Sequence, residues 1–149
     1  MFKYGSIRNF IVKFLVGTIL FGFGLIYFVS LYTYSANDPG FNQLNYNINA
    51  SNVENFIGFF GAYLSSYSLI FIGTLSYLLV FLIILEGGKL FLGISSKFII
   101  LKFFSNLTGI ILINVSIKSV GIAFLNTGLV SQFLVDLYTN ININFLENI

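Results

Sequence analysis

Long apolar runs without a charged residue limit what this chain can fold into. Phe14–Tyr32 is one such run and Gly58–Leu85 is another, and both are rich in Leu, Ile and Phe. A helix needs about 20 apolar residues to cross the hydrocarbon core of a bilayer, which is about 30 Å thick. The second run would extend about 42 Å as a single helix, longer than that core. We therefore predict one membrane span at 14–32 and a second at 68–85, preceded by an interfacial helix start.

Two further runs are weaker candidates for membrane spans. Ile99–Ile117 is apolar but contains Lys102 and several amide and hydroxyl groups, and we predict a third span there, at 99–117. Ser119–Val135 also carries polar side chains and is followed directly by Asp136. A charged side chain inside a bilayer is costly. This run is therefore predicted not to cross the membrane, although a fourth span stays open.

The composition agrees with a small all-α integral membrane protein. Hydrophobic residues make up 57% of the chain and charged residues 8%, whereas about 25% of residues are charged in globular domains. The chain also has no cysteine and no histidine. These absences exclude disulfides, thiolate or imidazole metal sites, and Cys-His or Ser-His-Asp catalytic groups. We therefore expect no catalytic, cofactor-binding or metal-binding residues.

The distribution of basic residues predicts the orientation in the membrane. Six of the seven lie before the first span or around the connection between the second and third spans: Lys3, Arg8, Lys13, Lys89, Lys97 and Lys102. Because basic residues concentrate on the cytoplasmic side, we predict a cytoplasmic N-terminus, an external loop at 33–57 and an external tail at 118–149. The first apolar run is longer than a signal-peptide core and no A-x-A-like site follows it, which favours an uncleaved anchor over a cleaved signal peptide.

The segment Glu86–Lys89 has the sequence E-G-G-K, which resembles part of a phosphate-binding loop. The required pattern is absent, because position 83 is Ile instead of Gly and Leu90 replaces the Ser or Thr. We interpret the segment as a helix C-terminus, with glycine stopping the helix and Lys89 in its last turn. Glu86 is also a candidate intramembrane proton carrier, but its place beside Lys89 favours an interfacial residue.

Small residues recur at helical spacing at the start of the second apolar run. They form two adjoining faces, with Gly58, Ala62 and Ser66 on one and Gly61 and Ser65 on the other. Small side chains at this spacing let helices approach closely in membranes. We therefore predict that this segment packs against another helix, in the same chain or in a second copy. Thr18 and Gly22 repeat the spacing in the first span, where packing and chance explain it equally well.

A longer motif carries a family resemblance. The segment from Thr33 to Phe41 reads T-Y-S-A-N-D-P-G-F, and that from Asn55 to Leu64 reads N-F-I-G-F-F-G-A-Y-L. This pattern resembles the N-terminal four-helix membrane domain of FtsK/SpoIIIE-type DNA translocases. In that family S-Y-x-x-x-D-P-S-aromatic follows the first span, and N-x-x-G-x-x-G-A-x-x-A-D opens the second. Further on, Gly73 and Tyr77 match an F-G-x-x-A-Y segment, and Asn126–Val130 lies where the family has a G-G-x-I-G segment.

The chain departs from this family pattern at a few positions. Gly40 stands where Ser is usual, Ser65 and Ser66 replace Ala and Asp, and Val80 takes a place often held by Pro. Residues 1–149 are expected to form a single membrane domain of this type. The family's cytoplasmic linker and its motor have no counterpart in these residues, which predicts a truncated product, one half of a split gene or a fragment.

The resemblance implies a non-enzymatic module that anchors and assembles a translocase in the membrane. In the family this domain links cell division at the septum with chromosome segregation. It implies a multi-pass protein of the bacterial inner membrane whose partners are the lipid bilayer, further copies of itself and divisome membrane proteins. We expect no cofactor, and no direct binding of nucleic acid, because orientation in the membrane alone accounts for the excess of basic residues on the cytoplasmic side. The residues expected to shape the loop and the helix packing are Tyr34, Asp38, Pro39, Phe41, Asn55, Gly58, Gly61, Ala62, Gly73 and Tyr77.

Two other classes of function stay open. An accessory subunit of a respiratory or transport complex would need an intramembrane ionisable pair, a quinone site or a haem ligand, and the lack of histidine weakens that reading. A holin-like pore former would produce membrane lesions on expression. The Asp-Pro pair and the N-x-x-G-x-x-G-A signal argue against a pore former.

Overall fold

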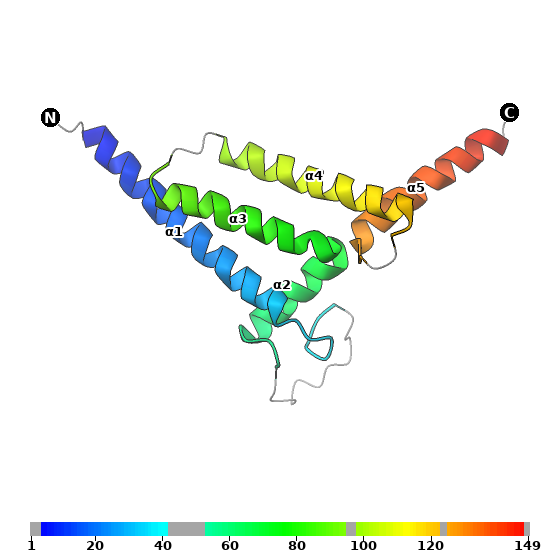
Figure 1. Ribbon diagram of the computed structural model, residues 1–149, viewed down its shortest axis with the longest axis horizontal. Coiled ribbons are helices and arrows are strands. Elements are labelled where there is room, and N and C mark those ends of the chain that lie inside the picture. Colours follow the sequence, from blue (N-terminus) through cyan, green and yellow to red (C-terminus); the bar gives the residue numbers. More distant parts are fainter. Residues whose placement is uncertain (1–3, 42–52, 95–97, 123–124, 148–149) are drawn as a thin grey trace.

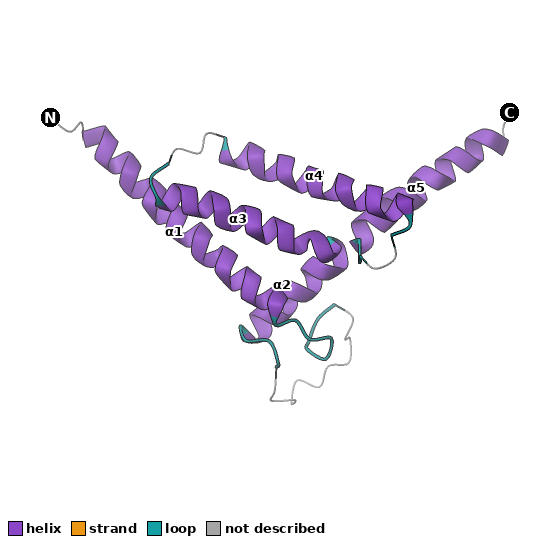
Figure 2. Cartoon of the chain, in the orientation of Figure 1, coloured by secondary structure: helices purple, strands orange, loops and turns teal. Residues whose placement is uncertain are grey.

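The described part of the chain is built from helices and contains no strand (Figures 1 and 2). The computed structural model describes residues 4–41, 53–94, 98–122 and 125–147. In order along the chain, the elements are α1 (Tyr4–Tyr32), α2 (Gly58–Phe71), the short 3-10 helix η1 (Gly73–Leu75), α3 (Ser76–Phe91), α4 (Ile99–Val120) and α5 (Gly128–Glu147).

Three helical segments are long and apolar enough to cross a membrane. They are Ile7–Tyr32, Gly73–Phe91 and Ile99–Val120. The predictions of an all-α integral membrane protein and of three spans are therefore confirmed for the residues that the structure describes. The first helix starts earlier than its apolar run, at Tyr4, because basic residues such as Lys13 form helix well and nothing before the run interrupts it.

The predicted bounds of the second span are wrong. The sequence predicted one continuous helix through 68–85, whereas α2 ends at Phe71 and α3 begins at Ser76. Gly73 has a φ of +80°, a conformation that other residues rarely adopt, and it breaks the helix between them. Ser76 Oγ donates to Ser68 O at 2.9 Å and to Gly73 O at 2.7 Å, so one hydroxyl joins the last turn of α2 to η1 across the break.

α3 also runs further than predicted, because the glycines at 87 and 88 do not stop it. Gly87 is buried within the helix, where a Cβ would lie 2.6 Å from the backbone N of Phe21 in α1. The helix stops one turn later, where Gly93 has a φ of +76° and donates its N–H to Leu90 O at 2.9 Å. The glycine at 87 serves close packing, and Gly93 ends the helix.

α1 and α3 lie side by side along most of their length (Figure 1). A Cβ on Gly17 would lie 2.8 Å from Phe91 Cα of α3, and a Cβ on Gly24 would lie 2.7 Å from Ile84 Cγ1 of the same helix. By contrast, a Cβ on Gly22 would meet nothing within 4 Å, and Thr18 is exposed. The face of α1 that packs is thus the one that carries Gly17 and Gly24. Beside this contact lies the apolar core, made of Tyr27, Leu31, Leu79, Val80, Ile83 and Ile110.

α4 and α5 are attached less closely to this pair. Ile110 and Asn114 are the buried residues of α4. α5 packs through its first turns on α4, α2 and η1 and then extends away, so that its C-terminal end and the N-terminal end of α1 lie at opposite ends of the molecule, both toward the top of Figure 1. The predicted tail at 118–149 therefore contains the end of α4 and a 20-residue helix. α5 is not among the three span candidates in the described residues.

Candidate functional site

Asp38 and Asn55 join the two ends of the connection between α1 and α2. Asp38 is 6% exposed, and its Oδ1 accepts the Glu54 N–H at 2.7 Å while its Oδ2 accepts the Asn55 N–H at 2.9 Å. Hydrogen bonds to an ionised acceptor are roughly twice as strong as neutral ones. We call Thr33, Asp38 and Asn55 the loop clasp.

Asn55 carries the loop clasp to the end of α1. Its Nδ2 donates to Ser30 O at 2.9 Å and to Thr33 O at 3.3 Å. The last carbonyls of a helix have no partner within the helix, so this side chain caps α1 from a distant point in the sequence. Asn55 Oδ1 accepts the Ile57 N–H at 3.1 Å, and Thr33 Oγ1 accepts the Phe56 N–H at 3.2 Å. One amide therefore connects the end of α1 to the entry of α2.

Two glycines and an alanine shape the start of α2. Gly58 has a φ of +70°, and its N–H donates to Asn55 O at 2.8 Å. At Gly61, one turn later, a Cβ would lie 2.6 Å from Ile57 Cβ and would also collide with the Asn55 side chain. Ala62 is 1% exposed. Gly61 is thus required because the loop clasp lies directly against the helix, whereas Gly58 is favoured by its positive φ.

Pro39 and Phe41 hold the first half of the connection on α2. Pro39 is fully buried, and the Phe41 N–H donates to Ser66 Oγ at 3.2 Å. The Phe41 ring meets Tyr67 and Phe71 edge-on, with ring centroids 5.8 and 5.9 Å apart, a favoured arrangement for aromatic pairs. The small face of α2 therefore receives a loop of its own chain.

Tyrosines add contacts between the helices. Tyr77 OH donates to Leu31 O at 2.8 Å, which pairs another carbonyl at the end of α1. Tyr27 OH donates to Ser68 Oγ at 2.6 Å and joins α1 to α2. Tyr34, which the family pattern placed among the residues that shape the loop and the helix packing, is 39% exposed and lies at the surface beyond α1.

Gly73 and Gly128 meet where α2, α3 and α5 come together. Both have a positive φ, and a Cβ on either one would lie 2.7 Å from the backbone N of the other. Asn126 O accepts a backbone N–H of η1 at 2.7 Å, and Asn114 Nδ2 donates to Ile72 O at 2.7 Å. An unpaired backbone group within a bilayer costs several kcal/mol. Asn114 of α4 and Asn126 of the turn before α5 therefore bond to backbone groups beside the break between α2 and α3.

The chemistry of these contacts is structural. Buried polar side-chain atoms in the described residues all have hydrogen-bond partners, and no group of three or more potential metal ligands occurs in that part of the chain. Lys89 Nζ lies 2.9 Å from Glu86 Oε1, which agrees with an interfacial ion pair better than with a proton carrier. The motif residues bend, cap and fasten the backbone.

Comparison with known protein families identifies the family to which the chain belongs. A family model described as the 4TM region of DNA translocase FtsK/SpoIIIE matches residues 11–134. This chain belongs to that family. The resemblance inferred from the motif is therefore confirmed. Comparison with curated proteins and with solved structures gave no match.

Two departures from the FtsK/SpoIIIE pattern lie against each other. A Cβ on Gly40 would lie 2.7 Å from Ser66 Cβ, at the two places where the family pattern has Ser and Asp. Because both residues are smaller here, the loop backbone reaches α2 directly and the Phe41 N–H bonds to Ser66 Oγ. The sequence showed both departures but not that they touch.

The match to the FtsK/SpoIIIE region ends at residue 134, inside α5. The family description names four transmembrane segments, and α5 follows α4 in the place of the fourth. α5 carries Asp136 in its third turn and is less apolar than α1, α3 and α4. The match thus ends within a helix that is more polar than the three span candidates.

Some residues that shape this arrangement were not singled out from the sequence. Asn114 was noted only as a polar residue that weakens a span, although an isolated amide in an apolar helix is a signal for an interhelical hydrogen bond. Gly17 and Gly24 gave no signal at four-residue spacing, since they are two turns apart. Gly128 was noted only as part of a resembling segment.

Proposed function

We propose that this chain is a membrane-embedded anchoring and assembly module of an FtsK/SpoIIIE-type translocase, placed at the septum, where it links cell division with chromosome segregation. The family match over residues 11–134 carries the proposal. The loop clasp supports it, because the motif residues Asp38 and Asn55 are used to hold a rigid connection between membrane helices.

In this proposal the chain has no catalytic activity, no cofactor and no direct contact with nucleic acid. It acts as a homo-oligomer in the bilayer and binds other membrane proteins of the divisome. The basic groups near the helix ends, among them Arg8, Lys13 and Lys89, are accounted for by orientation in the membrane. They need no nucleic-acid partner.

Localisation tests the function. We expect a fluorescent protein fused to residues 1–149 to concentrate at constriction sites in dividing bacteria. Asp38→Asn, which weakens the loop clasp, should reduce the midcell signal, whereas Asp136→Asn at an exposed position of α5 should leave it unchanged. Uniform membrane fluorescence of the unmodified fusion in constricting cells would contradict a septal role.

We also propose a cytoplasmic N-terminus and an external connection between α1 and α2, in the bacterial inner membrane. The support is that the described connection residues, 33–41 and 53–57, contain no Lys or Arg, whereas Lys89 lies at the far end of α3.

Because the chain has no cysteine, single introduced cysteines report this orientation directly. Asn37→Cys and Ile94→Cys place a thiol at exposed positions beyond opposite ends of the α1–α3 pair. A membrane-impermeant maleimide should label Asn37→Cys in intact spheroplasts and Ile94→Cys only after the membrane is opened. The reverse pattern would invert the proposed topology.

A further inference from the structure

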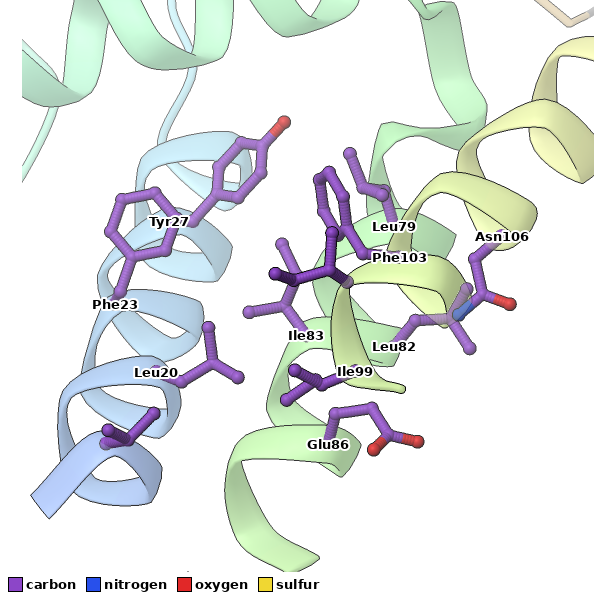
Figure 3. A pocket seen from close by; sticks show the side chains of 12 residues that line it. Leu20, Phe23, Tyr27, Leu79, Leu82, Ile83, Glu86, Ile99, Phe103 and Asn106 are labelled. Atoms are coloured by element: carbon purple, nitrogen blue, oxygen red, sulfur yellow. The ribbon is translucent and has the colours of Figure 1, made fainter. Parts of the chain in front are cut away.

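A cavity of about 460 Å³ opens between the α1–α3 pair and the first half of α4 (Figure 3). Leu20 and Phe23 of α1, Leu82 and Ile83 of α3, and Ile99 and Phe103 of α4 line it. The walls are almost entirely hydrocarbon, and the polar lining residues Glu86 and Asn106 lie at its edges (Figure 3). We call this space the α1–α3–α4 groove.

The groove exists because α4 is held by its middle. Asn114 Nδ2 bonds to Ile72 O, and Ile110 packs into the core. Toward its N-terminal end, Ile100 is 70% exposed and Phe103 is 42% exposed, although both line the groove. α1 and α3 approach each other closely at Gly17 and Gly87, whereas the first half of α4 stands off from them and leaves the groove between.

An apolar space of this kind does not stay empty in a bilayer. Atoms that line a void lose their dispersion contacts, and water needs two to four polar partners to be held in a cavity. Hydrocarbon chains surround a membrane protein at this depth and match the apolar walls. An acyl chain is therefore the filler that the chemistry of the groove favours.

The charges near the groove indicate which headgroup such a chain would carry. Lys13, Lys89 and Lys102 each lie three positions along their own helix from a lining residue, and Glu86 is the carboxylate among the lining residues. Three ammonium groups against one carboxylate give an excess of two positive charges. Each basic residue near the membrane surface raises the affinity for anionic lipid about fivefold.

We propose that the α1–α3–α4 groove is a lipid-binding site that takes an acyl chain of one anionic phospholipid, with the headgroup against Lys13, Lys89 and Lys102. The groove would then be completed by the lipid, which would add contacts between the first half of α4 and the α1–α3 pair. The site depends on the bilayer alone and not on the proposed role at the septum.

Native mass spectrometry of the full chain in detergent, with phosphatidylglycerol or phosphatidylcholine added, tests the site. We expect one phosphatidylglycerol to remain bound per chain. Val16→Trp introduces a large ring at a lining position and should lower the retained lipid at least tenfold. Val12→Trp, one turn away on the same exposed helix surface and outside the lining, should retain it. Equal retention by both variants would overturn the proposal.

The headgroup preference is tested separately. We expect Lys13→Gln combined with Lys102→Gln to lower the preference for phosphatidylglycerol over phosphatidylcholine by about 25-fold. Lys118→Gln at the other end of α4 should not change it. Equal binding of the two lipids by the unmodified chain would refute an anionic site. A lipid-free dimer that Val16→Trp dissociates would assign the groove to a second copy and would also overturn the proposal.

Discussion

Removing the charge of Asp38 should open the loop clasp without unfolding the helices. The buried carboxylate accepts two backbone N–H groups, from Glu54 at 2.7 Å and Asn55 at 2.9 Å. A hydrogen bond to a charged group contributes about 1.5–3 kcal/mol, and a neutral one about 1 kcal/mol. Asp38→Asn keeps at most one neutral bond and turns an amide NH₂ toward the other donor. The clasp should therefore lose about 3 kcal/mol.

Hydrogen–deuterium exchange measures this loss directly. Because 1.36 kcal/mol corresponds to a tenfold change, the amides of Glu54 and Asn55 should exchange about 150-fold faster in Asp38→Asn if they exchange by local opening. Amides in the middle of α1 and α3 should keep their protection, since their hydrogen bonds do not involve the clasp.

The matched control is Asp136→Asn, which removes a carboxylate of the same kind from an exposed position on α5. It should leave exchange at Glu54 and Asn55 unchanged. If Asp38→Asn keeps the helices and changes exchange at these two amides less than threefold, the bonds to Asp38 do not stabilise the connection, and our reasoning about the clasp is refuted.

Two further substitutions test the helix contacts by thermal unfolding in detergent. Gly87→Ala should destabilise the protein by about 1–3 kcal/mol, because the new methyl group would overpack against α1. Gly22→Ala has open space around the new methyl group and should stabilise the protein by about 0.5–1 kcal/mol. Equal effects of the two substitutions would contradict close packing at position 87. Asn114→Leu leaves Ile72 O without its partner and should cost about 0.6–1.7 kcal/mol, and no loss relative to Ser116→Ala would show that this bond does not hold α4.

The loop clasp illustrates how far the sequence reaches. The family pattern singled out Asp38, Pro39 and Asn55 as residues that shape the loop and the helix packing. That pattern could not show that the Asp38 carboxylate bonds to the Asn55 backbone across 17 residues. That contact depends on the path of the loop, which residue types do not encode locally.

The sequence by itself determined that the chain is a membrane protein, that three segments are long and apolar enough to cross a bilayer, and that the family is that of the FtsK/SpoIIIE membrane region. Each of these rests on local patterns, namely apolar length and a short motif of unusual residues. Only the tertiary structure decided that Gly73 breaks the second apolar run and that Gly17 and Gly87 are the packed glycines. These outcomes depend on which backbones approach one another, because a glycine looks the same in the sequence whether it breaks a helix, ends it or lies beneath a neighbouring one.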